Sequence, residues 1–299
     1  MTVESPMAAS SSVAVIGCGL MGAGIAQISI QSGYKVSLYG RNEGKLNATR
    51  DSIRKGVQRV AMKKMGPLAA DQEHLANYVN AQMDLLSLFT EVESAVQDAW
   101  IVIEAIAENL QQKLELFERV QTTCSRNTLL ITNTSSLKLS QMLPCIERPE
   151  NFAGLHFFNP VPLMKLVEVV ATEETSEETL NTLRTFCTKI GKKYVDAKDT
   201  PGFIVNRLLI PFLIDSIRMV ERGDATKEDV DAAMKCGTSH PMGPIELCDY
   251  VGLDTLQSTL DIFRESVPGD QRFDRCELLD QLVSEGKLGK KTKQGFYTY

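Results

Sequence analysis

A glycine-rich motif between two short apolar segments constrains the fold of this chain more than any other feature. Residues 13–16 are apolar, residues 17–22 read Gly-Cys-Gly-Leu-Met-Gly, and a helical pattern continues to Ile30 before a second strand-like segment at residues 35–39. A strand, GxGxxG, a helix and a strand within about thirty residues is the arrangement that binds dinucleotides, because the glycines let the backbone approach a pyrophosphate at the positive end of the helix. We predict that the motif contacts a cofactor through Gly17, Gly19, Leu20, Met21 and Gly22.

Strand-like and helix-like segments alternate through the first two-thirds of the chain, which predicts an α/β fold with a doubly wound, Rossmann-type sheet. The further strands are expected at residues 83–86, 100–103, 128–132, 152–155, 166–170 and 193–195, and the further helices at 43–80, 90–97 (capped by Thr90), 110–123 and 177–190. From Phe203 to about residue 282 the periodicity is helical, and the turn residues Asp199-Thr200-Pro201-Gly202 precede it, with Pro201 expected at a helix start. We predict a dinucleotide-binding domain at residues 1–199 and an all-helical domain at residues 200–299.

Polar side chains follow three successive strands of the predicted sheet. Glu108 comes after the strand at 100–103, Asn133 and Ser135 after the strand at 128–132, and His156 at the end of the strand at 152–155. Because open α/β sheets bind ligands at the carboxyl ends of their strands, we expect these residues to line one crevice.

His156 and Glu168 form a candidate pair of base and orienting acid. The segment between them contains Asn159-Pro160-Val161-Pro162, and its two prolines force a turn that can bring the two residues together. A neutral imidazole accepts a proton near pH 7, and a carboxylate fixes its tautomer and stabilises its cation. The alternative is a core histidine beside a strand that carries a glutamate.

The cofactor ribose is usually read by an acidic residue at the end of the second strand, where this chain has Gly40 followed by Arg41. A missing carboxylate and an added guanidinium favour a 2′-phosphate, so we expect NADP(H) to be accepted or preferred. The alternative is a solvated surface arginine.

Composition excludes several classes of protein. The chain has 299 residues, a net charge of −6 and no basic run, which argues against nucleic-acid binding. No apolar stretch reaches the ~18 residues that a membrane span needs. Seven cysteines without a CxxC pair indicate reduced thiols rather than disulfides or a metal site. The first dozen residues resemble neither a secretory signal nor a transit peptide, so a cytoplasmic location is expected.

Eight stretches together resemble the short, monofunctional L-3-hydroxyacyl-CoA dehydrogenases, which in bacteria are also called 3-hydroxybutyryl-CoA dehydrogenases. They occur in the family's order and span nearly the whole chain: residues 17–27, 133–137, 154–160, 164–169, 199–207, 241–244, 249–254 and 289–297.

The resemblance implies a role for each matching residue. His156 is the general base or acid, Glu168 is its partner, and Ser135 and Asn206 hold the reacting oxygen of an acyl-CoA substrate. Lys63, together with Ser135, contacts the CoA substrate. The family positions near the nicotinamide half of NAD(H) are Glu108, Lys113, Asn133 and Asn159, and Lys291 is a further cofactor contact.

The apolar stripes of the helical domain are broader than a domain of about 100 residues needs, so, partly by resemblance, we expect a homodimer formed through that domain. The resemblance also makes the mitochondrial matrix the alternative location. Two positions depart from the family pattern. Gly40 replaces the acid that reads the ribose, and Gly56 stands where many relatives have a serine that contacts CoA.

Two rival functions remain open at this stage. One is a dehydrogenase of a free hydroxy or sugar acid on the same fold, although Phe157-Phe158-Asn159-Pro160 favours the CoA branch. The other is a cofactor-binding protein that has lost catalysis, against which stands the presence of His156, Glu168, Ser135 and Asn206.

Overall fold

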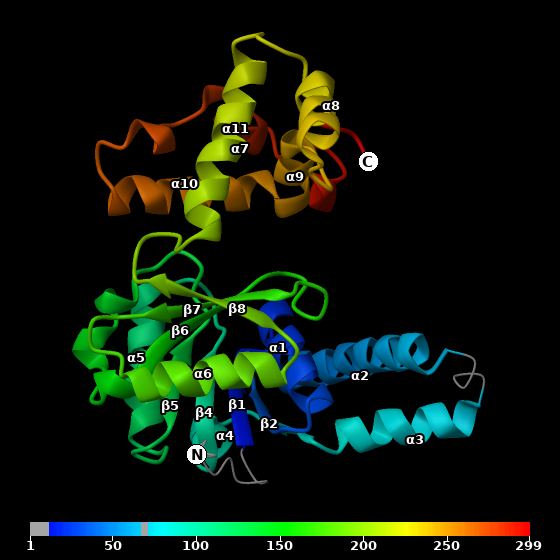
Figure 1. Ribbon diagram of the computed structural model, residues 1–299, viewed down its shortest axis with the longest axis vertical. Coiled ribbons are helices and arrows are strands. Elements are labelled where there is room, and N and C mark those ends of the chain that lie inside the picture. The colour runs from blue at the N-terminus through cyan, green and yellow to red at the C-terminus, as the bar shows by residue number, and fades with distance from the viewer. Residues whose placement is uncertain (1–11, 67–70) are drawn as a thin grey trace, which may run out of the picture. The chain divides into compact units, whose positions relative to one another are not determined.

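The computed structural model describes residues 12–66 and 71–299. Of the first dozen residues, on which the predicted location rests, all but Ser12 lie outside that part. The chain divides into two compact units, Met1–Asp199 and Thr200–Tyr299. The first unit contains a sheet with helices on both faces, and the second contains helices (Figure 1).

The described part of the first unit contains an eight-stranded sheet in the order β3-β2-β1-β4-β5-β6-β7-β8. Its strands are β1 Ser12–Ile16, β2 Lys35–Tyr39, β3 Leu86–Phe89, β4 Ala99–Glu104, β5 Leu129–Thr132, β6 Phe152–Phe157, β7 Leu166–Ala171 and β8 Lys193–Lys198. Among these eight described strands, only the β6–β7 pairing is antiparallel. Residues 158–165 are too few for a parallel crossover, which needs about a dozen residues or more. The strand order reverses between β1 and β4, where such sheets bind their ligands.

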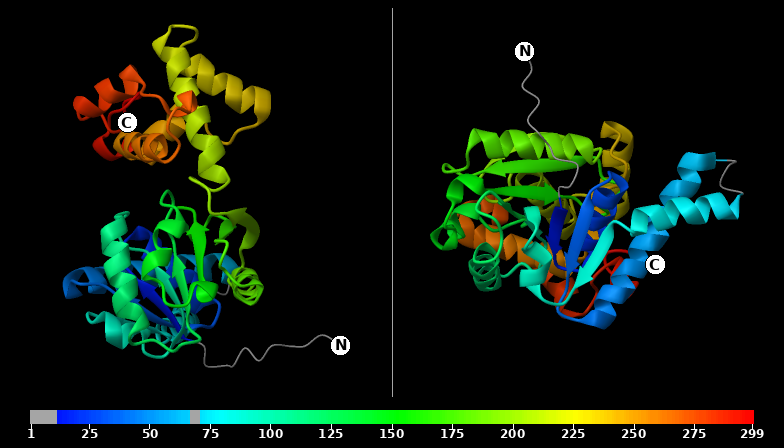
Figure 2. Two further views of the ribbon diagram at one scale, coloured as in Figure 1. Left: turned by 90° about the vertical axis from the view of Figure 1, so that its left-hand side faces the viewer. Right: turned by 90° about the horizontal axis from the view of Figure 1, so that it is seen from below.

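Helices cover both faces of this sheet. They are α1 Leu20–Gln31, α2 Glu43–Met65, α3 Gln72–Met83, α4 Val92–Val96, α5 Leu110–Gln121 and α6 Glu177–Lys189. Figure 2 shows α5 and α6 on opposite sides of the strands. Buried side chains of α1, α2, α3 and α6, among them Ile25, Ile53, Val79 and Phe186, share one core with β1, β2 and β4. The pair α2 and α3 projects sideways from the sheet as a helical hairpin (Figure 1).

Four expected boundaries are wrong. The helical segment expected at 43–80 is two helices, α2 and α3. Met83 ends α3, so the strand expected at 83–86 begins at Leu86. The helix expected after Thr90 has Glu91 at its N-cap, and Pro201 lies in a turn before α7 rather than at the start of a helix. Short apolar runs at the junction of two elements fit either period, which explains the error at Met83.

The second unit is helical, as predicted. Its helices are α7 Val205–Glu221, α8 Lys227–Thr238, α9 Pro244–Val251, α10 Leu253–Ser266 and α11 Glu277–Ser284. They enclose a separate apolar core that includes Ile214, Ile245, Leu256 and Phe263. The C-terminal segment is bound to this core, because the buried carboxylate of Asp249 accepts hydrogen bonds from the N–H groups of Phe296 and Tyr297 and from the Tyr299 hydroxyl.

Candidate active site

The glycine loop between β1 and α1 has the geometry of a phosphate cradle. Gly17 has a φ of +123°, and a Cβ there would lie 2.4 Å from the carbonyl oxygen of Ala105. A Cβ on Gly22 would lie 1.8 Å from the carbonyl oxygen of Gly17, so only glycine lets α1 begin so close to the loop. Gly19 is the N-cap of α1, and a Cβ there would meet nothing within 4 Å. The open surface at the positive end of a helix fits a dinucleotide pyrophosphate.

His156 and Glu168 face each other across β6 and β7, where the antiparallel register pairs them directly. The distance from His156 Nδ1 to Glu168 Oε2 is 2.6 Å, and the two residues are 4% and 0% exposed. The predicted chain reversal is thus confirmed. The Phe158 ring packs against the imidazole, with 4.5 Å between ring centroids. A histidine held in this way has a defined orientation, and its Nδ1 is committed to the carboxylate.

The loop after β5 is organised by one carboxylate oxygen of Glu108. This oxygen, Oε1, accepts hydrogen bonds from the backbone N–H groups of Ser135 (2.9 Å) and Ser136 (3.1 Å), and from the hydroxyls of Thr134 (2.5 Å) and Ser136 (2.9 Å). Burial alone raises the pKa of Glu108, but the positive charge of Lys113 and these hydrogen bonds outweigh it, so the pKa lies below its ordinary value. Glu108 therefore holds the Ser135 loop as an ionised acceptor.

Lys113 lies buried between two glutamates, with a side chain 1% exposed. Its Nζ is 2.6 Å from Glu104 Oε1 and 3.2 Å from Glu108 Oε2. Glu104 ends β4 and also accepts hydrogen bonds from the Ile106 N–H (2.7 Å) and the Thr132 hydroxyl (2.6 Å). One buried carboxylate thus connects the ends of β4 and β5 to α5. Lys113 forms ion pairs with both acids in the structure. Its predicted contact with the cofactor would therefore be made from within this network of charges.

The ends of β5 and β6 are joined directly. The side-chain oxygen of Asn133, the residue after β5, accepts a hydrogen bond from the N–H of Phe157, at 3.0 Å. Asn133, Ser135, Glu108 and His156 therefore belong to one connected edge of the sheet, as expected from their positions after successive strands.

A pocket of about 410 Å³ lies between α1, α2 and the loop after β6. Its wall is formed by Gln27 of α1, by Gly56, Arg59 and Lys63 of α2, and by residues 159–163. The structure thus places Asn159 and Lys63 on the same pocket. A Cβ on Gly56 would lie 2.1 Å from the side-chain oxygen of Gln27, so the buried Gln27 amide fills the space in which a serine side chain would stand.

Lys192 is a site-supporting residue that the sequence did not reveal. It is 8% exposed and lies between α6 and β8, and its Nζ donates hydrogen bonds to the carbonyl oxygens of Val161 and Met164, the latter at 2.6 Å. Burial lowers its pKa. The Lys192 ammonium thus holds the loop at residues 159–164 in place. In the sequence, no local pattern distinguishes Lys192 from the neighbouring surface lysines.

The sequence also did not reveal Glu104, Thr134 and Ser136 as parts of the site, for a related reason. A glutamate at the end of an apolar run and small hydroxyl residues in a loop are common, and only the sheet register brings them to Glu108 and Lys113. The sequence signal that could have indicated this network is the combination of two acids and one lysine, Glu104, Glu108 and Lys113, within ten residues at the end of a buried strand.

Asn206 and Lys291 lie in the second unit, in α7 and in the short 3₁₀ turn Lys290–Thr292. The Lys291 ammonium contacts both carboxylate oxygens of Asp254, with Oδ2 at 2.5 Å. Arg41 is exposed and lines a cavity of about 190 Å³ with Tyr39, Ile106 and Arg119.

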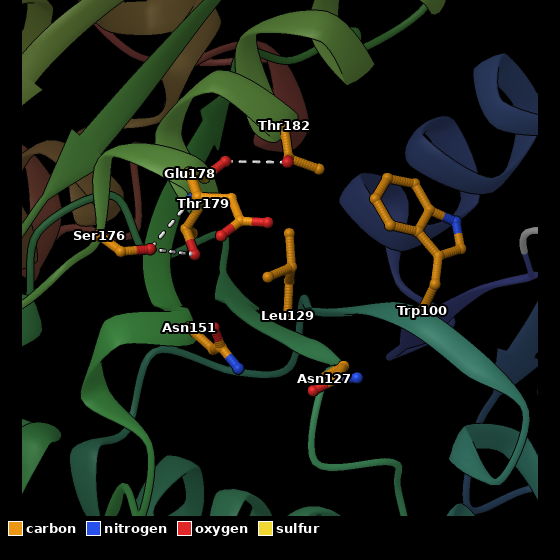
Figure 3. A pocket seen from close by; sticks show the side chains of 8 residues that line it. All are labelled: Trp100, Asn127, Leu129, Asn151, Ser176, Glu178, Thr179 and Thr182. Atoms are coloured by element: carbon orange, nitrogen blue, oxygen red, sulfur yellow. Dashed lines mark hydrogen bonds between the residues drawn. The ribbon is translucent and has the colours of Figure 1, made fainter. Parts of the chain in front are cut away.

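A second pocket, of about 250 Å³, lies at the opposite edge of the sheet (Figure 3). Trp100 and Leu129 come from the first residues of β4 and β5, and Ser176, Thr179 and Thr182 from the start of α6. The hydroxyls already serve α6: Ser176 accepts from the Thr179 N–H at 3.1 Å, and Thr182 donates to the Glu178 carbonyl at 2.8 Å. None of the predicted catalytic residues lies there, so this pocket is not the candidate active site.

Within residues 12–66 and 71–299, no cluster of histidine, cysteine and acidic residues could hold a metal ion. All seven cysteines have free thiols. No described helix combines the length and the apolar character that crossing a bilayer requires.

Comparison with known proteins identifies the family of this arrangement. Residues 12–200 match the family described as 3-hydroxyacyl-CoA dehydrogenase, NAD binding domain, and residues 202–299 match its C-terminal domain. The chain belongs to the 3-hydroxyacyl-CoA dehydrogenase family. The resemblance seen in the sequence is confirmed, and with it the Rossmann-type domain followed by a helical one and the NAD(H) cofactor of this oxidoreductase family.

Relatives in this family come from animals and bacteria. The chain is 48% identical over 289 residues to the mitochondrial hydroxyacyl-coenzyme A dehydrogenase of Rattus norvegicus, covering 96% of this chain and 90% of that one. It is 39% identical over 287 residues to a probable 3-hydroxybutyryl-CoA dehydrogenase of Bacillus subtilis, covering 96% of each chain. The crystal structure of (S)-3-hydroxybutyryl-CoA dehydrogenase from Ralstonia eutropha is similar at a TM-score of 0.89 and 29% identity, covering 97% and 99% of the two chains.

Proposed function

We propose that this chain oxidises L-3-hydroxyacyl-CoA to 3-ketoacyl-CoA with NAD⁺, and catalyses the reverse reduction with NADH. The observation that carries the proposal is the buried pair of His156 and Glu168 at the end of β6, in a chain of the 3-hydroxyacyl-CoA dehydrogenase family. The sheet edge that holds this pair also holds the glycine loop that fits a dinucleotide.

In the proposed mechanism His156 exchanges a proton with the 3-hydroxyl group. Glu168 faces Nδ1, so the exchange falls to Nε2. As the hydroxyl loses its proton, a hydride leaves C3, the C–O single bond becomes a carbonyl and the imidazole becomes an imidazolium. The carboxylate of Glu168 stabilises this cation without taking its proton. The bound nicotinamide supplies the acceptor for the hydride.

Ser135 has the proposed role of hydrogen-bond donor to the reacting oxygen, and Asn206 shares it by family resemblance. The Ser135 backbone is fixed by Glu108, which favours a constant position for the hydroxyl. Donors that are held in place stabilise a developing charge without reorganising. Glu108, Lys113, Asn133 and Asn159 keep their proposed places near the nicotinamide half of the cofactor, and Lys291 remains a proposed further contact with the cofactor.

The pocket between α1 and α2 is the proposed site for the CoA moiety. Its wall combines apolar groups such as Val60 and Pro162 with the cations Arg59 and Lys63. The apolar surface can pack against the pantetheine chain of CoA, and the cations can bind the phosphates of CoA. The presence of Arg59 and Lys63 in the pocket wall is the observation that favours a CoA thioester over a free hydroxy acid.

The proposal is tested by initial rates of reduction, with saturating NADH at pH 7, for acetoacetyl-CoA and for free acetoacetate. We expect a much higher kcat/KM for the thioester, because binding of the remote CoA moiety contributes to the transition state. Lys63→Ala should raise the KM for acetoacetyl-CoA about tenfold or more, the effect of losing one charged hydrogen bond. Lys64→Ala, which changes the next and exposed residue of α2, is the matched control. Equal activity with free acetoacetate would favour a free hydroxy acid as substrate instead.

We further propose that the second unit mediates a homodimer. Exposed apolar side chains in that unit, Leu208 (69% exposed) and Val251 (41%), support it. The proposed compartment is the cytoplasm, with the mitochondrial matrix as the alternative that the animal relatives suggest.

A further inference from the structure

The position that normally reads the cofactor ribose is closed to an acidic side chain in this chain. Gly40 follows the last residue of β2 and is buried. A Cβ at this position would lie 2.5 Å from Cys18 Sγ and 3.1 Å from both Cys18 Cβ and Leu46 Cγ. The thiol of the glycine loop thus fills the space in which an aspartate or glutamate would stand. Selection for the 2′-hydroxyl of NAD(H) by a carboxylate is therefore absent at position 40.

The residue after Gly40 is a cation, Arg41. Arg41 is exposed and lines the cavity of about 190 Å³ at the ends of β2 and β4, next to the glycine loop. The other arginine of this cavity, Arg119, is bound by Glu93 at 2.8 and 3.2 Å. Within the described residues no carboxylate lies at ion-pair distance from Arg41. Its guanidinium is thus available to a ligand.

The surroundings of Arg41 are mixed in charge. Asn42 caps α2 by accepting a hydrogen bond from the Lys45 N–H at 2.8 Å, so the positive end of a 23-residue helix starts beside Arg41. The opposing carboxylates are Glu43 in the first turn of α2 and Glu115 on the cavity wall. Gln111 donates a hydrogen bond to Glu115 at 3.0 Å. Among these groups, Arg41 is the exposed cation that lines the cavity without an ion-pair partner in the described residues.

We propose that this chain binds NADP(H) more tightly than NAD(H), with the 2′-phosphate held by the Arg41 guanidinium. A planar guanidinium binds phosphate oxygens through two parallel hydrogen bonds, whereas the neutral 2′-hydroxyl gains little from it. The Cys18–Gly40 contact removes the carboxylate that would repel the phosphate. The inference goes beyond the NAD binding assigned to the first unit: NAD(H) still binds and supports the proposed reaction, while NADP(H) is the tighter ligand. It does not depend on the acyl substrate.

Calorimetric titration of the full-length protein with NADPH and with NADH, at one ionic strength and without any acyl-CoA, tests the proposal. We expect NADPH to bind about tenfold to a hundredfold more tightly, the range for a hydrogen bond to a charged group. Arg41→Gln should abolish this difference and leave the Kd for NADH within about twofold. Arg50→Gln, which removes an exposed arginine paired with Asp51 on α2, is the matched control and should preserve the difference.

A second pair of variants tests the steric part. Gly40→Asp alone should weaken both cofactors, because the new Cβ collides with the Cys18 thiol. Cys18→Gly combined with Gly40→Asp should restore NADH binding and reverse the preference. Tighter binding of NADH to the wild-type chain, or an Arg41→Gln variant that affects the two cofactors equally, would overturn the proposal. Neither result would argue against the proposed activity on acyl-CoA substrates, because no such substrate takes part in the titration.

Discussion

At the residue scale, the site depends on buried charges that are paired rather than exposed. Lys113 is held between Glu104 and Glu108, and His156 is held by Glu168. A buried charge that loses its partner is strongly destabilising, whereas a complete pair is close to neutral. We therefore expect single substitutions in these pairs to destabilise the first unit strongly.

Replacing Lys113 by methionine tests this sensitivity. It leaves Glu104, which is 0% exposed, without its cation, so the free energy of unfolding should fall by about 3–5 kcal/mol. Urea unfolding at pH 7 measures the change. The double variant Glu104→Gln/Lys113→Met should recover part of the loss, because no buried anion remains without a partner at position 104. A loss below about 1 kcal/mol in the single variant would contradict the proposed network.

The low pKa of Glu108 makes a separate prediction about acid stability. A carboxyl whose pKa is lower in the folded state stabilises the fold at pH values above its ordinary value of 4.5, and this stabilisation disappears as the pH falls through the lowered value. The difference in unfolding free energy between the wild type and Glu108→Gln should therefore be largest near pH 7 and should shrink below about pH 4.5. Urea unfolding at pH 7, 5 and 4 checks this, and a difference that stays constant with pH would show that Glu108 acts without its charge.

At the element scale, strand order and one short connection place the site. The strand order reverses between the parallel strands β1 and β4, and the segment between β6 and β7 is too short for a parallel crossover. The shortness of the second connection is visible in the sequence, which is why the meeting of His156 and Glu168 could be predicted, whereas the strand order could not. The pocket wall could not be predicted, because it depends on Lys192, which acts from 28 to 31 positions away.

Lys192→Met tests how the loop at residues 159–164 is held. Without the ammonium, the carbonyl oxygens of Val161 and Met164 lose their donor, so we expect a lower Tm and a higher KM for acetoacetyl-CoA. The kcat should change less, because His156 and Glu168 are held by the β6–β7 pairing. Lys193→Met, at the adjacent exposed position, serves as the control. An unchanged KM would separate this loop from the CoA site.

At the scale of the whole molecule, the division into a sheet unit and a helical unit follows from the change in periodicity near residue 199. Sequence predicts which elements belong to each unit, because alternating and helical periods are local properties. It does not reveal networks such as Glu104, Lys113 and Glu108, since these depend on which strands become neighbours.

The oligomeric state is a prediction at this scale. Sedimentation equilibrium should give twice the chain mass of 33.1 kDa, because the exposed apolar side chains of the second unit are expected to be covered by a second copy. A monomer mass over the whole micromolar concentration range would count against the homodimer.

The most direct test of the proposed mechanism is the single substitution His156→Gln, assayed for reduction of acetoacetyl-CoA at pH 7. We predict that kcat falls by about 10²–10⁴-fold, the contribution of a positioned general acid or base. Cofactor binding, measured by calorimetry on the same preparation, should stay close to that of the wild type. A variant that binds cofactor normally and keeps a kcat near the wild-type value would remove His156 from the proton-transfer step and contradict the mechanism.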